Sequence, residues 1–279
     1  MRDKIEKIGR NSLIQHGKLS DRIYLMKLEK EEAVGIIQII DELARRNKYS
    51  KIFCKVQASV APLFTASGFI PEAHIPQFFN GNESVFFMSK FLSSDRLLNI
   101  ETNKLQELSE LLRKTEIKSF KLPEISEQIS IRKLTEKDRL QMAELYKKVF
   151  QSYPFPIFDP EYIRKTMKTG VQYFGIEESG QLVALASSEV NAEAQNAEMT
   201  DFATLPSHRG KKYAYLLLQA MEEKMKAEGI KTVYTIARLQ SVGMNLTFLR
   251  MNYEFAGTLL KNTNISGDIE SMIVYFKNI

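Results

Sequence analysis

Four basic side chains surround one glycine just before a long amphipathic segment. His208, Arg209, Lys211 and Lys212 flank Gly210, and the segment that follows carries apolar side chains at helical spacing. The first amide groups of a helix lack partners inside the helix, and the helix dipole is positive there, so a phosphate is a common ligand at that end. This stretch predicts a strand–loop–helix unit whose loop is either a phosphate-binding cradle or a solvated basic turn.

The residues from 129 onward alternate between strand patterns and helix patterns. Strands are expected at 129–134, 173–191 (a hairpin turning at 179–180), 197–205, 232–238, 255–262 and 270–278. Helices are expected after a capping box formed by Thr135 and Asp138, from the basic loop to Gly229, and at 241–251. This order of elements predicts an α/β fold with a mixed sheet.

The first 95 residues repeat part of this plan. A strand at 21–28 and a helix at 31–47 precede the stretch 50–69, which parallels 231–253. The parallel predicts an internal duplication, although convergent patterning produces a similar picture. The first copy has three glutamates and no glycine before its helix, which would repel phosphate. We therefore expect the phosphate site in the second copy only, with the first serving as a scaffold or as a wall of an acceptor pocket.

Composition excludes several classes of function. The chain has 279 residues, of which 44% are hydrophobic and 26% charged, and its formal net charge of +5 comes from interspersed signs. This mild excess does not predict nucleic-acid binding. Cys54 is the single cysteine, so no internal disulfide is expected and a reducing cytoplasm fits. No metal is expected because the histidines lack metal-ligand spacing, and neither a signal peptide nor a membrane-spanning run is expected.

The strand, Pro206, the sequence SHRGKKYA and the helix together resemble the acyl-CoA-binding motif of the GNAT superfamily of N-acetyltransferases. That motif is Arg or Gln, two residues, Gly, one residue, then Gly or Ala; Lys212 stands where the family usually has a second glycine. The resemblance implies the GNAT fold over residues 129–279, with acetyl-CoA as cosubstrate, its pyrophosphate on the loop and its pantetheine arm along the strand. The residues implied to bind it are Phe202, Ala203, Thr204, Arg209, Gly210, Lys211, Lys212, Tyr213 and Ala214.

The resemblance is closer to one subfamily. The stretches 235–245 and 252–272, with the extra N-terminal half-unit, resemble the β-lysine N-acetyltransferases, which acetylate the terminal amine of β-lysine to make a compatible solute. We therefore expect a degenerate GNAT-like half-domain at 1–95, a linker helix and connector at 96–127, and the acetyltransferase domain at 128–279. Alternatives are another small amine or a protein lysine as acceptor, or a non-catalytic acyl-CoA-binding regulator. The expected partner is a small-molecule amine, with no nucleic acid and no membrane, and a homodimer is compatible with the chain.

Acetyl transfer needs a base, because a side-chain amine with a pKa of about 10.4 is protonated at neutral pH. The resemblance implies a carboxylate on the strand before the loop, either Glu198, at the usual position, or Asp201. Strand alternation predicts that these two side chains point to opposite faces, so that at most one faces the acetyl group. The family's general acid is commonly a tyrosine on the following helix, but Phe248 stands there and is expected only to pack.

The acceptor needs contacts for two amines and one carboxylate. The aromatic stretch 152–162 joins the first two helices, where the family places an acceptor-binding loop, and its rings are either cation–π partners or a lid on the core. Arg238 is expected to hold the carboxylate or to be a surface cation, and polar residues of the last hairpin to hold ammonium groups or to form its turn. The residues predicted to contact the acceptor are Tyr153, Phe155, Arg238, Asn262, Asn264 and Glu270.

Overall fold

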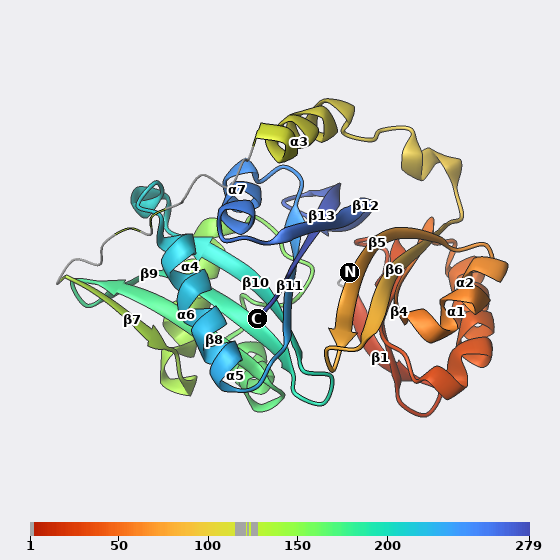
Figure 1. Ribbon diagram of the computed structural model, residues 1–279, viewed down its shortest axis with the longest axis horizontal. Coiled ribbons are helices and arrows are strands. Elements are labelled where there is room, and N and C mark those ends of the chain that lie inside the picture. The colour runs from red at the N-terminus through yellow and green to blue at the C-terminus, as the bar shows by residue number, and fades with distance from the viewer. Residues whose placement is uncertain (1–2, 115–120, 122, 124–127) are drawn as a thin grey trace.

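The computed structural model describes residues 3–114, 121, 123 and 128–279, and its strands form one 13-stranded sheet (Figure 1). The strand order is β1-β2-β3-β4-β6-β5-β12-β13-β11-β10-β9-β8-β7. The first unit contains β1 (Lys4–Ile8), β2 (Ser12–Gly17), β3 (Arg22–Lys27), α1 (Ala33–Asn47), β4 (Lys51–Gln57), α2 (Ala61–Ala66), β5 (Ile70–Phe79) and β6 (Glu83–Phe91), and α3 (Thr102–Lys114) follows it. The second unit contains β7 (Ile129–Lys133), α4 (Arg139–Val149), α5 (Pro160–Lys168), β8 (Val171–Glu178), β9 (Gln181–Asn191), β10 (Asn196–Thr204), α6 (Tyr213–Ala227), β11 (Thr232–Arg238), α7 (Val242–Arg250), β12 (Glu254–Ile265) and β13 (Asp268–Asn278).

The helices and strands expected from the sequence are present, and local chemistry explains where they end. Ser179 and Gly180 adopt positive φ angles of 52° and 81° at the turn between β8 and β9, as a tight hairpin favours. The Thr135 amide donates to Asp138 Oδ2 at 2.7 Å, which confirms the capping box before α4. Gly229, with a φ of 77°, follows the end of α6 and lets the chain leave the helix.

Two strands at the start of the chain were not expected. β1 is a mostly exposed edge strand, and β2 buries Gln15 and His16, so neither strand has the apolar alternation that identifies a strand in sequence. The helix expected between the units is α3, whose Leu108 is buried. The connector expected after this helix falls on 115–127, which lies almost entirely outside the described residues.

The two units share one topology. In each, a hairpin (β1–β2 or β8–β9) is followed by strand, helix, strand, helix and a last hairpin, in the spatial orders β3-β4-β6-β5 and β10-β11-β13-β12. The first two strands of each set are parallel and the remaining pairs are antiparallel. This agreement supports the predicted duplication. β5 and β12, which end the two spatial orders, pair at Ala73 and Gly257 and join the units into one sheet.

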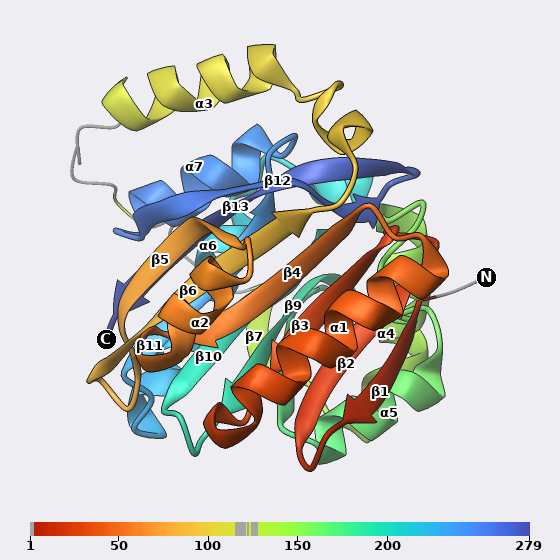
Figure 2. The same cartoon turned by 90° about the vertical axis from the view of Figure 1, so that its right-hand side faces the viewer.

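α1 and α2 cover the outer face of the first unit and α6 that of the second, and the inner faces of the two units meet (Figures 1 and 2). The inner face of the first unit is turned toward β9–β13. α5 lies on the inner face of the second unit, where Thr166 contacts Tyr173, the strand partner of Ser187.

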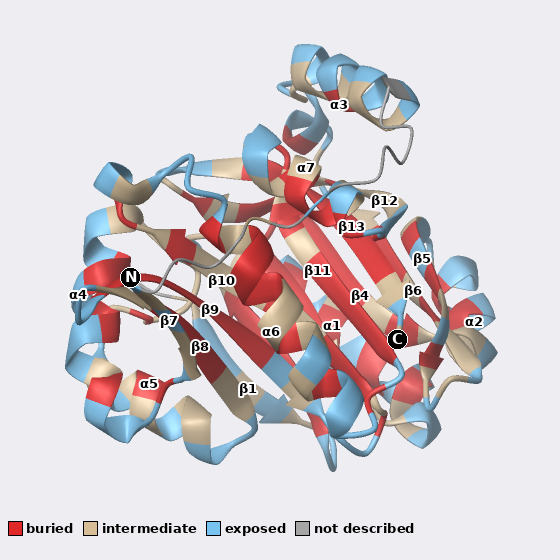
Figure 3. Cartoon of the chain, turned by 60° about the vertical axis from the view of Figure 1, so that its left-hand side comes forward, coloured by how far each residue is buried: buried red, intermediate tan, exposed pale blue. Residues whose placement is uncertain are grey.

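Between the units, Tyr24 and Phe53 of the first pack in one buried cluster with Tyr234 and Val274 of the second. Buried residues therefore continue along the central strands, while the outer turns of the helices are exposed (Figure 3). No helix in the described ranges is both long and apolar enough to cross a bilayer.

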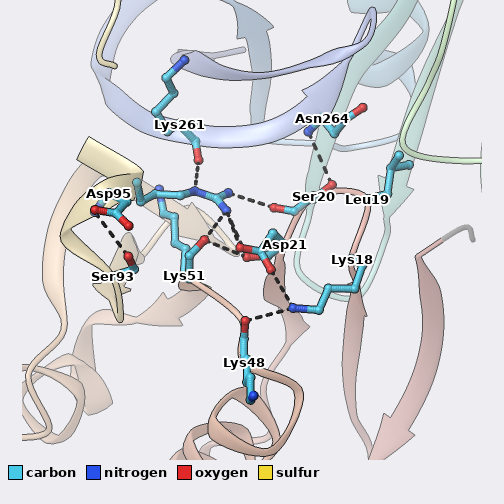
Figure 4. Close-up of polar contacts among 12 residues, drawn as sticks. Lys18, Leu19, Ser20, Asp21, Lys48, Lys51, Ser93, Asp95, Lys261 and Asn264 are labelled. Carbon is cyan, nitrogen blue, oxygen red and sulfur yellow. Dashed lines mark hydrogen bonds and ion pairs between the residues drawn. The ribbon is translucent and has the colours of Figure 1, made fainter. Parts of the chain in front are cut away.

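A buried polar joint holds the first unit against β12. Lys51 Nζ lies 2.8 Å from Glu72 Oε2 and 2.7 Å from the Leu260 carbonyl oxygen, and Glu72 Oε1 accepts the Leu260 amide at 2.8 Å. The Lys51 and Glu72 side chains are 0% and 4% exposed. Arg96 donates to the Lys261 carbonyl at 2.8 Å, and Figure 4 shows Lys261 directly above Lys51 in this joint. Since β12 shifts register here, these contacts stabilise an irregular segment.

Candidate active site

A cavity opens where two parallel strands separate. β10 and β11 pair only from Asn196 to Glu198 on one side and Thr232 to Tyr234 on the other. Beyond that point the strands diverge, and a cavity of about 680 Å³ lies between them, lined by β10, β11, α6, α7 and the basic loop. The edge of β10 that faces β11 therefore has no backbone partner along the cavity, whereas its other edge stays paired with β9.

The basic loop forms one end of this cavity. Gly210 has a φ of 84° and Lys212 a φ of 62°, and α6 begins at the next residue, Tyr213. Lys212 thus adopts the left-handed conformation that the family's glycine takes without strain, at a cost of about 1 kcal/mol for a side chain with a Cβ. Arg209 and Lys212 both line the cavity beside the first turn of α6. The loop keeps the backbone shape of an anion-binding helix N-terminus despite the missing glycine.

Glu178, the last residue of β8, binds the other cations of the loop. Its carboxylate oxygens lie 2.8 and 2.9 Å from Lys211 Nζ, 2.9 Å from the Tyr213 hydroxyl and 3.2 Å from His208 Nε2. The hydrogen bond from Lys211 is the main reason that the pKa of Glu178 is lowered. Lys211 is absent from the cavity lining. Arg209 and Lys212 therefore face the cavity and Lys211 faces Glu178, so the predicted contact of Lys211 with acetyl-CoA has no support from this arrangement and stays a prediction.

The other residues predicted to bind acetyl-CoA line the cavity, with the exception of Ala203. Ala203 is buried in the core, 2% exposed, and contributes only backbone to this strand. The predicted residues that line the cavity are Phe202, Thr204, Arg209, Gly210, Lys212, Tyr213 and Ala214.

A bulge in β10 brings the two candidate bases to one face of the sheet. The register between β9 and β10 shifts between Thr200 and Ala203, and Asp201 has a left-handed φ of 57°. Asp201 accepts hydrogen bonds from the Ser187 hydroxyl at 2.6 Å and the Tyr153 hydroxyl at 2.5 Å. Ser187 lies two residues before Glu189, the direct partner of Glu198 across the strands. The prediction that Glu198 and Asp201 point to opposite faces is therefore wrong, because a bulge interrupts strand alternation.

Three carboxylates and one lysine gather on this inner face. Lys55 of the first unit donates to the Tyr234 hydroxyl at 3.1 Å, and Tyr234 donates in turn to Glu198. Burial raises the pKa of Glu198 and Asp201, and burial together with the charge of Glu198 raises the pKa of Glu189 to about 8. We call the group Glu189, Glu198, Asp201, Lys55 and Tyr24 the acidic recess.

The acidic recess is enclosed by both units yet remains open to solvent. Glu189 keeps an exposed side chain and Glu198 a half-buried one, although desolvation is the main cause of the raised pKa of each. Both carboxylates are therefore reachable from solvent and have protein on several sides. Asp201 also lines the cavity between β10 and β11, so the recess and the cavity meet at this residue. Within the described part of the chain no cluster of His, Cys, Asp and Glu has the arrangement of a metal site.

The residues predicted to contact the acceptor are only partly brought together. Tyr153 and Arg238 line the cavity. Arg238 binds Glu270 through two hydrogen bonds of 2.9 and 2.6 Å, so these two side chains neutralise each other. The remaining three lie outside the cavity lining: Phe155 packs against the core, Asn262 is buried on β12, and Asn264 is half-buried on the same strand.

Sequence reasoning missed the residues that the first unit contributes. Tyr24 and Lys55 lie on strands whose sequences have the pattern of ordinary apolar strands. The signal that could have identified them is a polar side chain at a position expected to point inward. Glu189 was not predicted, because the resemblance implies a carboxylate only on the strand that carries Glu198, and Glu189 lies on the neighbouring strand. Phe248 packs against the rings of its neighbours at centroid distances of 5.1 to 6.0 Å, which confirms its expected role.

Comparison with known proteins places this fold and cavity among the enzymes that transfer acetyl groups to amines. A model of the acetyltransferase (GNAT) family matches residues 139–245. The chain is 38% identical to a β-lysine N(6)-acetyltransferase of Methanococcus maripaludis, over 99% of this chain and 98% of that protein. It is 30% identical to N-acetyltransferase YodP of Bacillus subtilis over the full length of both, and 35% identical to a β-lysine N(6)-acetyltransferase of Methanosarcina mazei over 54% of this chain and 56% of that protein. The chain belongs to the GNAT family of N-acetyltransferases.

Proposed function

We propose that the protein transfers the acetyl group of acetyl-CoA to the terminal amine of β-lysine, giving N6-acetyl-β-lysine. The observation that carries this proposal is the cavity that joins the cationic loop to Asp201 through the gap between β10 and β11. The phosphates of acetyl-CoA would lie at the loop end of the cavity and the acceptor amine at the Asp201 end. Donor and acceptor would then approach β10 from opposite sides. The names of two relatives, one of them matched over its whole length, support β-lysine as the acceptor.

The donor would bind along β10 with its pyrophosphate on the loop. Gly210 and the first residues of α6 line the cavity, so the positive end of the helix dipole faces it, and Arg209 and Lys212 supply positive charge. The edge of β10 that faces the cavity lacks a strand partner, so the backbone from Phe202 to Thr204 is available to pair with the amides of the pantetheine arm. The acetyl group would then lie near Asp201, at the meeting point of cavity and recess.

The acceptor amine must lose a proton before it attacks. In this mechanism Asp201 contacts the ammonium group in the cavity, and Glu198 with its raised pKa is a further proton acceptor on the same face. The neutral amine nitrogen attacks the thioester carbonyl carbon, the carbon–sulfur bond breaks, and CoA leaves as a thiolate; the second proton of the attacking nitrogen passes to this thiolate or to solvent, so that the amide and CoA are the products. A thiol has a pKa of about 8.5, so the thiolate is a tolerable leaving group without an assigned tyrosine acid.

Mass spectrometry of a reaction with acetyl-CoA tests the proposal directly. The panel of acceptors is β-lysine, lysine, a polyamine and a lysine-containing peptide. We expect the highest kcat/KM with β-lysine, and a product that carries the acetyl group on N6. Product with another member alone would overturn the choice of acceptor and keep the acetyltransferase. Binding of CoA without any turnover would favour the non-catalytic regulator.

A pH dependence follows from Glu189. Because its pKa is raised to about 8, Glu189 gains its negative charge as the pH rises through that value, and this charge attracts the ammonium groups of the acceptor. We expect KM for the acceptor to fall between about pH 7 and pH 9, and to fall less steeply in the Glu189→Gln variant. The ratio of the two KM values at each pH removes the acceptor's own titration. A constant ratio would contradict an acceptor placed beside Glu189.

The compatible-solute role, the cytoplasmic location and the homodimer remain predictions. The first follows from the product that the proposed reaction makes, and the second from the single cysteine. The third is testable by measuring the mass of the native particle in solution.

A further inference from the structure

Arg22, the first residue of β3, is a buried cation whose guanidinium has aromatic rings beside it but no ion-pair partner among the described residues. It is 4% exposed, and its Nε and Nη1 atoms are buried without any hydrogen bond. Across the described ranges no carboxylate forms an ion pair with its guanidinium; Asp3 and Glu72 attract it through space only. Buried polar groups that serve only structure are normally hydrogen-bonded, and buried charges are normally paired. The unpaired guanidinium therefore points to a ligand.

The charge around Arg22 favours an anionic ligand. Lys51, its neighbour on β4, and Arg96 are also buried, and Glu72 is the buried carboxylate beside them. Lys51 is held by Glu72, and Arg96 by the carbonyl oxygens of Ser20, Asp21 and Lys261 at 2.8 to 3.0 Å; Figure 4 labels these three acceptor residues around Lys51. Burial and the neighbouring Arg96 lower the pKa of Arg22 to about 10, so it still carries its charge at neutral pH. Two of the three cations are satisfied, and Arg22 is left to bind an anion.

Arg22 lies on the same inner face as the acidic recess. Its guanidinium carbon is 5.3 Å from the centre of the Tyr24 ring and 5.5 Å from that of Phe53. Burial, and after it the charge of Glu198, raises the pKa of Tyr24. Tyr24 therefore contacts the guanidinium through its ring and lies close enough to Glu198 to feel its charge.

The second unit closes this space from the other side. Gln15, the partner of Tyr24 on β2, donates to the Pro154 carbonyl at 3.1 Å. The residue before it in the loop, Tyr153, donates to Asp201. The loop thus connects the first unit to the residue where cavity and recess meet. The Oε1 atom of Gln15 is buried without a partner and is a further polar group available to a ligand.

Opposite charges at the two ends match a zwitterionic acceptor. Arg22 lies level with Lys51 on β4, and Lys55, which interacts with Glu198, is four residues further along, roughly 13 Å in a strand. An extended six-carbon diamino acid spans that interval when the Arg22 side chain extends toward its carboxylate and the Glu198 side chain toward its ammonium group. We propose that Arg22 binds the carboxylate of the amino-acid acceptor, so that the first unit completes the acceptor site. This inference rests on the proposed acetyl transfer to a diamino acid.

Removing the charge of Arg22 should change selectivity between an amino acid and the corresponding amine. The two acceptors are β-lysine and 1,4-diaminopentane, which is β-lysine without its carboxylate. For Arg22→Met we expect KM for β-lysine to rise roughly 10- to 100-fold, as loss of a charge-assisted hydrogen-bonded pair implies. The kcat/KM for 1,4-diaminopentane should change by less than about threefold. The control is Arg46→Met, which removes an exposed arginine of α1 and should leave both acceptors unaffected.

Stability separates this role from a structural one. Because an unpaired buried charge is unfavourable, Arg22→Met should keep or raise the melting temperature, and β-lysine should raise that temperature in the native protein more than in the variant. Equal losses with both acceptors, or native-like discrimination in the variant, would overturn the role of Arg22 and leave the proposed function standing. Native protein that acetylates neither acceptor would overturn the proposed function, and this inference with it.

Discussion

Replacing Asp201 with asparagine is expected to lower kcat for acetyl transfer by about 10²- to 10⁴-fold, the range in which general bases contribute. Asp201 lines the cavity, and the bulge in β10 turns it toward the face where the acceptor would lie. The hydroxyls of Ser187 and Tyr153 hold its carboxylate in one orientation. Asparagine keeps this shape but cannot accept the proton of an ammonium group, so chemistry should suffer while binding of CoA stays native.

Steady-state kinetics with a saturating donor, together with CoA titration by calorimetry, measure both quantities. Ser187→Ala is the matched control, because it removes one hydrogen bond to Asp201 and leaves the carboxylate; a loss of about tenfold or less is expected there. Glu198→Gln identifies the proton acceptor. A severe loss in Glu198→Gln with a mild one in Asp201→Asn would move the role to Glu198. Native kcat in Asp201→Asn would remove Asp201 from the mechanism.

The basic loop and its helix are predictable because their signals are local. Pro206 ends the strand region, Gly210 permits a left-handed turn, and the apolar spacing after Tyr213 specifies a helix. Each of these effects acts over a few residues and requires no knowledge of the tertiary fold. The direction of Lys211 is not local, because it depends on Glu178, a residue 33 positions earlier that β8 brings next to the loop.

The geometry of the carboxylates depends on strand register. Sequence alternation places Glu198 and Asp201 on opposite faces, and a bulge of one residue reverses that result. Nothing in the local pattern distinguishes a bulged strand from a regular one, since the left-handed Asp201 is stabilised by Ser187 and Tyr153, which are distant in sequence. The contribution of the first unit to the site cannot be predicted from the sequence for a similar reason. It depends on how the inner faces of the two units meet through β5 and β12.

Replacing Glu72 with glutamine is expected to lower the free energy of unfolding by about 3–5 kcal/mol, the loss measured when one partner of a buried ion pair is removed. Lys51 and Glu72 are almost completely buried, so at about pH 6, below the lowered pKa of Lys51, the remaining ammonium group would have no compensating charge, and the comparison is made at that pH. Glutamine keeps one oxygen to accept the Leu260 amide, and its NH2 group, in place of the second oxygen, can donate to the Ser89 hydroxyl oxygen, so the change removes the charge and keeps the shape. Urea denaturation followed by circular dichroism measures the loss, and Glu42→Gln on the exposed side of α1 should stay within about 0.5 kcal/mol of native.

The double variant Lys51→Met/Glu72→Gln distinguishes charge from packing. A neutral pair avoids the cost of an isolated buried charge, so the double variant should be more stable than Glu72→Gln alone. Desolvation lowers the pKa of Lys51 to about 7, far below its value in an unfolded chain. The unfolded state therefore binds more protons between about pH 7 and pH 10, and the free energy of unfolding should rise with pH in that window in the native protein. The rise should be smaller in the double variant, because Lys51 no longer titrates, although the buried Lys55, whose pKa burial also lowers, remains. A double variant as unstable as Glu72→Gln, with a native-like pH dependence, would show that the joint depends on packing around β12 and not on the buried charges.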